Sequence, residues 1–568
     1  MSDELVRAAS LEEVRSDGVS VAHVNGHTIA LFAQGEDVFA VDNRCPHMGF
    51  PLHRGTCNDG ILTCHWHHAR FDLVSGGTFD QFADDLRTFP VEIRDGEVWV
   101  DTRPREDVEE HQRKRLRDGL ERDLRLVIAK AVITLADGGR DPLEPVRIGL
   151  DFGTRHRRAG WGQGLTILGC MANLLPSLDP DDRPRALYHG LSAVAVESAG
   201  EPPRFQLRAL PGEAEPAQLK RWLRQFVEVR DGEGAERCIV SAVRSGASEQ
   251  ELADILFAAA TDHRYIQGGH ALDFVNKALE TLDGVGWDAA EPVLASLATG
   301  LAEAERMEES NAWRHPVDLV EILEAAFDQL PAASEGSRNG WAGRLQLIPV
   351  LLGEDAKASA EALLEALREG ASAEKLASAV SYAAALRIAR FPTSNEFGDW
   401  DTALHTFTFA NAVEQGLRRA PSAELVRGVF DAAMSVYLDR FLNVPATRLP
   451  DAGEGDIEQL PELLDQQQQV NEAGAVVAGY LSSGGDPDRL LAMLGRLLLR
   501  EDRDFHTIQT VEGAFRQFGR LRGTEEGTHV LVAAARYLAA HSPTVRAEGQ
   551  TYEIARRLHR GEKVYEEE

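Results

Sequence analysis

The feature that most constrains this sequence is a pair of short metal-ligand motifs in its first seventy residues. A C-x-H motif at Cys45 and His47 is followed, after sixteen residues, by a C-x-x-H motif at Cys64 and His67. This spacing puts one thiolate and one imidazole on each of two loops. Two Cys and two His suit a tetrahedral zinc ion. They also suit a two-iron cluster with both thiolates on one iron and both imidazoles on the other.

Strand-like runs surround these motifs. Asn25-Gly26 separates two alternating runs, Val21 to Val24 and Thr28 to Phe32, and Asp95-Gly96 lies between two more within residues 88–100. Asn-Gly and Asp-Gly between alternating apolar residues are typical of tight β-hairpins. We therefore expect a small all-β domain that carries the ligand residues in loops between its strands.

The residues around the two motifs resemble the Rieske ferredoxin pattern almost position by position, in the stretches 45–52 and 69–77. The resemblance favours an iron-sulfur site over zinc. It implies a 2Fe-2S cluster that cycles by one electron, with a reduction potential of roughly -150 to +300 mV because neutral imidazole replaces thiolate at one iron. The ligands implied by the resemblance are Cys45, His47, Cys64 and His67.

The second loop departs from the family pattern at two positions. His65 and His68 stand where the family usually has Pro and Gly, and the loss of the glycine could restrict the backbone beside the cluster. The two extra imidazoles either tune the potential or pass protons, or they are exposed residues without a role. Cys57 is expected to be a spectator. With no further cysteine pair in the loops, the resemblance is to the soluble ferredoxin and oxygenase type.

The rest of the sequence predicts a second, helical domain. A chain of 568 residues exceeds the size at which one core keeps growing, so two or more domains are expected. After Arg103 the pattern changes to long amphipathic segments with helical periodicity. We place the Rieske domain at residues 1–103 and a large all-α domain, with internal quasi-repeats, at residues 104–568.

Histidines recur in these quasi-repeats. His270 and His405 are each followed by Phe at i+4 and Asn at i+6, and His189 and His506 begin two looser copies. Helical bundles can bring inward side chains from several helices to one metal, so the four imidazoles could converge on an ion such as iron. The alternative is a histidine near each helix start that was retained through duplication, which needs no chemistry. The carboxylates that could complete a site are Asp262, Asp273, Asp401, Glu414 and Glu512.

The resemblance ends near residue 103. In Rieske oxygenases the second domain carries D-x-x-H-x-x-x-x-H, which binds a mononuclear iron. Asp262, His263 and His270 have the wrong spacing for that signature, and the helical periodicity does not fit the sheet of that catalytic domain. We therefore do not expect a Rieske dioxygenase, and no catalytic residue is identified from the sequence.

Function is predicted as that of an oxidoreductase. The cluster would accept single electrons from a reductase or ferredoxin and pass them to a metal site in the helical domain, where a small organic substrate is oxidised with dioxygen. The alternative is a non-catalytic electron-transfer or redox-sensing protein whose helical part is a docking scaffold. Nucleotide-binding motifs such as G-x-x-x-x-G-K-[ST] are absent where a site would need them.

Charge and hydropathy limit the partners and the location. A formal net charge of -31 argues against nucleic acid or an anionic membrane surface as a partner. No apolar run reaches the ~18 residues of a membrane span, and the first ten residues lack the basic and apolar regions of a signal peptide. Five cysteines are too sparse for a disulfide framework. A cytoplasmic location is expected.

Overall fold

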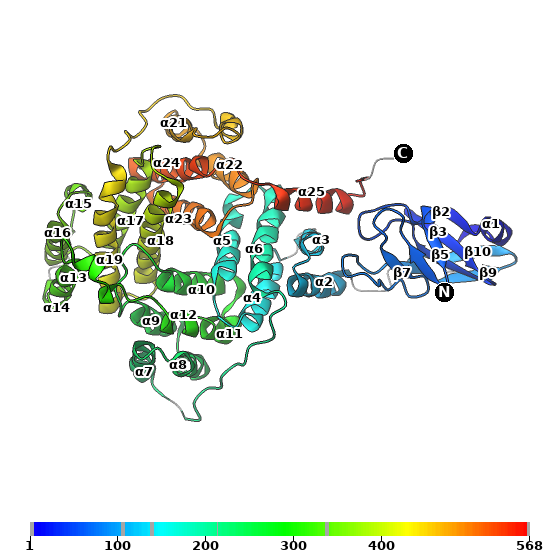
Figure 1. The fold of residues 1–568 in the computed structure, drawn as a ribbon, viewed down its shortest axis with the longest axis horizontal. Coiled ribbons are helices and arrows are strands. Elements are labelled where there is room, and N and C mark those ends of the chain that lie inside the picture. Colours follow the sequence, from blue (N-terminus) through cyan, green and yellow to red (C-terminus); the bar gives the residue numbers. More distant parts are fainter. Residues whose placement is uncertain (1–4, 104–107, 137–140, 213, 335–339, 565–568) are drawn as a thin grey trace. The chain divides into compact units, whose positions relative to one another are not determined.

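The computed structural model describes residues 5–103, 108–136, 141–212, 214–334 and 340–564. The chain divides into two compact units. The first unit contains the residues up to Pro145 together with those from Gln550 onward, and the second unit is Val146–Gly549. The described strands all lie in the first unit, and the second is built from helices (Figure 1).

Three small antiparallel sheets form the first hundred residues, with strand orders β1-β10-β9, β2-β3-β4-β8 and β5-β6-β7. The predicted small all-β domain and both hairpins are confirmed, because Asn25-Gly26 joins β2 to β3 and Asp95-Gly96 joins β9 to β10. The strands are β1 Leu5–Ser10, β2 Val19–Val24, β3 His27–Gln34, β4 Asp37–Asp42, β5 Thr56–Asn58, β6 Ile61–Thr63, β7 Arg70–Asp72, β8 Thr88–Phe89, β9 Val91–Arg94 and β10 Glu97–Asp101.

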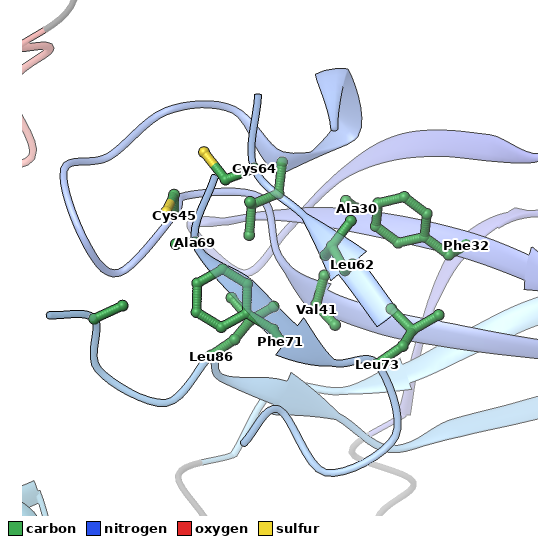
Figure 2. Packing of buried hydrophobic residues seen from close by; sticks show 12 residues of the cluster. Ala30, Phe32, Val41, Cys45, Leu62, Cys64, Ala69, Phe71, Leu73 and Leu86 are labelled. Carbon is green, nitrogen blue, oxygen red and sulfur yellow. The ribbon is translucent and has the colours of Figure 1, made fainter. Parts of the chain in front are cut away.

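A buried apolar cluster supports the ligand loops. Leu62 in β6 and Phe71 in β7 are fully buried and pack with Phe32 and Leu73. Figure 2 shows Cys45 and Cys64 together at one end of this cluster, away from Phe32 and Leu73. The cluster therefore gives both cysteine loops one rigid base.

The large helical region predicted from the sequence is confirmed, although its first residue at 104 stays a prediction. Among the described helices none combines the length and the apolar composition that a membrane crossing needs. The predicted cytoplasmic location stays a prediction.

The first unit also carries helix α1 Leu11–Asp17. The others are α2 Val108–Arg122, α3 Arg125–Ala136, α4 Glu144–His156, α5 Gln163–Leu174, α6 Arg183–Ser198, α7 Pro216–Glu228, α8 Gly232–Arg244, α9 Glu249–Ala260, α10 Ala271–Val285, α11 Ala290–Ala295, α12 Ala298–Ala302, α13 Leu319–Phe327, α14 Leu330–Ala333, α15 Arg344–Leu351, α16 Ala356–Arg368, α17 Ala373–Ala389, α18 Phe397–Arg419, α19 Ala423–Leu438, α20 Leu460–Leu463, α21 Val470–Ser482, α22 Pro487–Leu499, α23 Phe505–Leu521, α24 Glu525–Ala540 and α25 Ala547–His559.

Helices α5, α10, α18 and α23 form a ring inside the second unit. α18 packs against α10 and α23, and α5 packs against the same two helices (Figure 1). Gly169 allows the close approach of α5 to α10, because a Cβ there would lie 2.5 Å from the Thr281 hydroxyl oxygen. This ring carries the histidines described below.

Local sequence signals explain several helix starts. Ser248 accepts a hydrogen bond from the Glu251 amide, and Glu251 bonds back to the Ser248 amide, which completes a capping box at the start of α9. Ser372 caps α17 in a similar way through the Lys375 amide. Both helices therefore begin with a serine that caps the backbone.

Gly76 provides a stability test of the first unit. Its φ is +80°, and a Cβ on it would lie 1.9 Å from the Leu86 carbonyl oxygen. We expect Gly76→Ala to lower the opening free energy of peptides covering β5 to β7 by about 3 kcal/mol or more, because the collision adds to the cost of the left-handed backbone. Hydrogen exchange followed by mass spectrometry measures this opening.

Gly26 is the matched control. It has the same φ of +80° but nothing within 4 Å of its Cβ position. Gly26→Ala in the β2-β3 turn should cost only the backbone penalty, about 1–2 kcal/mol. Equal effects of the two substitutions would contradict the argument from the Leu86 contact.

Candidate functional site

The two cysteine loops have the same backbone hydrogen bonds. The Cys45 amide donates to the Phe50 carbonyl at 2.9 Å, and the Cys64 amide donates to the Ala69 carbonyl at 2.9 Å. Four residues after each cysteine, the Gly49 amide donates to the Cys45 carbonyl at 2.7 Å, and the His68 amide donates to the Cys64 carbonyl at 3.0 Å. The loops are thus closed in equivalent ways after β4 and β6.

His68 is the equivalent of Gly49. Gly49 has φ +80° and His68 has φ +60°, so both lie in the left-handed region that glycine favours. The His68 backbone therefore keeps the conformation of the glycine that the family usually has, at a conformational cost of roughly 1 kcal/mol.

The thiols of Cys45 and Cys64 lie side by side. Both side chains are buried, and they hydrogen-bond to each other. This bond raises the pKa of the Cys45 thiol and lowers the pKa of the Cys64 thiol to about 6. Because thiolate is the metal-binding form of cysteine, Cys64 gives up its proton to a metal more readily than Cys45.

The imidazoles of His47 and His67 form a second pair. Their ring centroids are 4.9 Å apart and the rings are nearly perpendicular. Burial lowers the pKa of His47 to about 4, and burial also lowers the pKa of His67. Neutral imidazoles and paired thiols thus stand as two separate donor pairs, which is the grouping that a two-iron cluster with mixed ligands uses.

Lys130 of α3 reaches the first loop. Its ammonium group donates to the carbonyl oxygen of Pro46 and, at 2.7 Å, to that of His47. Its charge also helps to lower the pKa of His47, after burial and the neighbouring His67. A cation therefore lies directly behind one candidate ligand.

The other loop residues singled out from the sequence lie outside the donor pairs. His65 is exposed and interacts with the Thr56 hydroxyl at 3.2 Å. Cys57 lies in β5, opposite Leu62. Its pKa is raised by burial, so it is a poorer source of thiolate than Cys64.

Three of the four helical-domain histidines come together. His270 directly precedes α10, His405 lies within α18 and His506 is the second residue of α23. One ring nitrogen from each lies within 4.8 Å of the others. The Nε2 atoms of His270 and His405 are 3.2 Å apart, and the His405 and His506 ring centroids are 4.7 Å apart.

Asp273 and Asp401 lie near the Nδ1 atoms of these rings. His270 Nδ1 lies 3.0 Å from the Asp273 carboxylate, which also accepts a 2.6 Å bond from the Gln509 amide. His405 Nδ1 lies 2.5 Å from the Asp401 carbonyl oxygen, and His506 Nδ1 lies 4.0 Å from the Asp401 carboxylate. The sequence offered these aspartates as ligands, whereas here they contact the histidines from behind.

Two supporting residues, Gln509 and Tyr537, were missed from the sequence. The Tyr537 hydroxyl donates to the Asp401 carboxylate at 2.9 Å. Gln509 lies three residues after His506 in α23 but bonds the aspartate behind His270, and Tyr537 lies in α24, at no helical spacing from His270, His405 or His506. By contrast, the i+3 spacing of His270 and Asp273 was a usable signal.

The three imidazoles differ in charge preference. Burial, together with the charges of His270 and His506, lowers the pKa of His405 to about 4, and burial lowers the pKa of His506. Burial also opposes charge on His270, but attraction to Asp273 outweighs it and raises the pKa of His270. At neutral pH His405 and His506 are therefore neutral donors.

His189 is not brought to this cluster. It lies buried within α6, with Nε2 3.2 Å from the Leu499 carbonyl oxygen and Nδ1 2.8 Å from the Glu548 carboxylate. The remaining carboxylates named from the sequence are paired with basic residues: Asp262 with Arg224, Glu414 with Arg418 and Glu512 with Lys277.

Comparison with known proteins concerns the first unit. The family model for the Rieske [2Fe-2S] domain matches residues 4–90. The ferredoxin component of the naphthalene 1,2-dioxygenase/salicylate 5-hydroxylase systems of a Ralstonia species is 29% identical over 101 residues, which are 18% of this chain and 97% of that protein. The 3-phenylpropionate/cinnamic acid dioxygenase ferredoxin subunit of Photorhabdus laumondii is 36% identical over 74 residues, 13% of this chain and 70% of that protein.

A solved structure gives a similar match. The ferredoxin of carbazole 1,9a-dioxygenase from Nocardioides aromaticivorans has 24% sequence identity and a TM-score of 0.17, covering 17% of this chain and 98% of that chain. The family model and the two sequence relatives agree on the same segment, which contains both cysteine loops. Through this segment the chain belongs to the Rieske [2Fe-2S] family, as a ferredoxin-type member related to electron-transfer components of oxygenase systems.

Proposed function

We propose that this protein is an oxidoreductase in which a Rieske cluster supplies single electrons to a metal ion held by His270, His405 and His506. The observation that carries the proposal is the convergence of these three imidazoles inside the helical unit of a Rieske protein. The helical unit would then be the catalytic part, and its reaction the oxidation of a small organic substrate with dioxygen.

The paired donors of the first unit fit the cluster. Cys45 and Cys64 would bind one iron, and His47 and His67 the other. When bound, the cluster accepts and releases one electron at a time. The chain's own contribution is to supply a thiol pair in which Cys64 ionises readily, two neutral imidazoles and the Lys130 cation behind His47. A reductase or ferredoxin is the proposed electron donor.

The contacts of His270 and His405 argue for a cation between them. Each ring turns Nδ1 toward an oxygen acceptor, so that the nitrogen carries the proton and Nε2 carries a lone pair. Two lone pairs that face each other at 3.2 Å repel unless a positive charge lies between them. A shared proton would bridge two rings only, whereas a metal ion bridges all three.

Three imidazoles, each neutral when it binds a metal, suit iron, copper or zinc. Because three protein ligands leave coordination positions open for exchangeable molecules, the site is of the catalytic rather than the closed structural type. Insertion of one oxygen atom of dioxygen into a substrate consumes two electrons and two protons and releases water. Two successive single-electron deliveries from the cluster balance this reaction, which favours iron at the three histidines.

Metal analysis of the full-length protein tests the proposal. We expect about three iron atoms per chain, two with labile sulfide and one without. The double variant His270→Ala/His405→Ala should lose the single iron and substrate oxidation, and it should keep the cluster spectrum. Inductively coupled plasma mass spectrometry and a labile-sulfide assay measure both pools.

His189→Gln is the control for this experiment. His189 was grouped with the other histidines by sequence but bonds elsewhere, so the variant should keep the third metal. A folded wild-type protein with two irons and an empty helical unit would refute the proposal and favour an electron-transfer protein with a helical scaffold. Zinc at the site would refute the redox role.

Asp273→Asn tests the support behind His270. The variant keeps the size of the side chain but removes the charge that faces His270 Nδ1 and can reverse the hydrogen bond. Residues that orient metal-binding histidines typically change metal affinity about 10–100-fold. We expect a loss of affinity in that range in competition with a chromophoric chelator, with an unchanged cluster. Unchanged affinity would contradict this role.

Lys130→Met tests the cation behind the cluster. Loss of a positive charge and of two hydrogen bonds to the ligand loop should lower the reduction potential, because the cation stabilises the added electron. A shift on the order of 50 mV, close to a tenfold change for one electron, is expected in a spectroscopic redox titration. Lys130→Arg retains the charge and should shift the potential less. Equal shifts would argue against an electrostatic effect.

A further inference from the structure

We propose that the cavity beside His270 binds a small, neutral, planar aromatic molecule as the substrate of the histidine site. This inference rests on the proposed function, because it assumes that the neighbouring imidazoles hold the reacting metal. The cavity lies wholly within the second unit and has a volume of about 270 Å³.

His270 belongs to both the cavity and the histidine cluster. It lines the cavity, and its Nε2 lies 3.2 Å from that of His405. Phe274, one turn further along α10, also lines the cavity and lies nearly parallel to the His270 ring, with centroids 5.3 Å apart. A molecule in the cavity would therefore contact a candidate metal ligand directly.

Aromatic and aliphatic side chains form most of the wall. Trp161, Tyr265, Phe274 and Phe409 contribute rings, and Tyr265 is held in place by stacking on Phe409 at an interplanar angle of 4°. Rings prefer offset-stacked or edge-to-face partners. An apolar cavity of ~150 Å³ holds benzene, so a volume of about 270 Å³ suits one ring with substituents or two fused rings.

The charged groups at the cavity favour a neutral ligand. Arg264 pairs with the buried Asp431 at 3.1 Å, and His263 lies 2.6 Å from the Glu308 carboxylate. Glu305 is exposed at the rim and would repel an anion. Among the described residues that line the cavity, each basic group thus faces a carboxylate of the protein, since His270 also faces Asp273. Burial of an unpaired carboxylate from a substrate would be costly.

Gly300 in α12 is an exposed residue on the open side of the cavity. It lines the cavity, and a Cβ built on it meets nothing within 4 Å. Its backbone is not in the left-handed region, so a larger side chain can be accommodated without backbone strain. Substitution of Gly300 is therefore a direct way to obstruct the open side of the cavity without touching the histidines.

Indole is the probe for this inference, since it is neutral, planar and made of two fused rings. We expect it to bind the full-length, metal-loaded protein with one site in isothermal titration calorimetry. Gly300→Leu should weaken the binding at least tenfold, because the leucine obstructs the open side of the cavity. Benzoate, of similar size but anionic, should bind more weakly than indole.

Gly519→Leu is the matched control. Gly519 is an exposed helical glycine in α23, also with nothing within 4 Å of its Cβ position, and it does not line the cavity. This variant should bind indole like the wild type. Absence of indole binding, an unchanged affinity in Gly300→Leu, or benzoate binding as tight as indole binding would overturn the inference.

The two proposals fail in different ways. If the third metal is absent while indole still binds and Gly300→Leu blocks it, the aromatic site stands and the oxygenase function falls. If the metal is present but indole binding does not respond to Gly300→Leu, the metal site stands and the cavity is not the substrate site. Metal content is therefore measured on each preparation that is used for binding.

Discussion

The buried ion pair between Lys277 of α10 and Glu512 of α23 is the interaction on which the helical unit depends. Their charged atoms are 2.6 Å apart, both side chains are 3% exposed, and Lys277 also bonds Glu280 at 2.7 Å. Burial opposes the charge of Lys277, but its two acidic partners outweigh this and raise its pKa. Removal of one partner from such a pair costs about 3–5 kcal/mol. The pair therefore holds α10 and α23 in one register.

That register brings the histidines together. His270 precedes Lys277 by seven residues and His506 precedes Glu512 by six, which correspond to about 10 and 9 Å along a helix. α18 runs in the same direction as α23. Gln517, further along α23 than His506, donates a 2.9 Å bond to Asn411, which lies further along α18 than His405. Three helices thus run past one another in parallel, and each presents its histidine at the same level. This explains why three side chains distant in sequence share one point.

The parts of this structure that depend on local chemistry were predicted from the sequence. The two motifs and the Asn-Gly and Asp-Gly turns each act over a few residues, and the fold reproduces the expected hairpins. The histidine group was reached only in part. The sequence around His189 is similar to that around the other histidines, but its helix α6 is not part of the ring of α5, α10, α18 and α23. Its Nδ1 contacts the Glu548 carboxylate instead. The cavity could not be predicted, because its lining residues, such as Gly300 and Phe409, come from different helices and have no regular spacing in the sequence.

The charged residues near the three histidines fall into two groups. Lys277 and Arg516 face Glu280 and Glu512, two positive groups against two negative ones, so this buried network balances its own charge. It therefore adds little net field at the histidines, two turns away. The carboxylates of Asp273 and Asp401 remain as the negative groups behind the imidazoles. Because three imidazoles leave the charge of a divalent ion uncompensated, these outer carboxylates can balance it while the ion keeps open positions. An arrangement that separates neutral ligands from outer charges in this way suits an ion that changes its oxidation state.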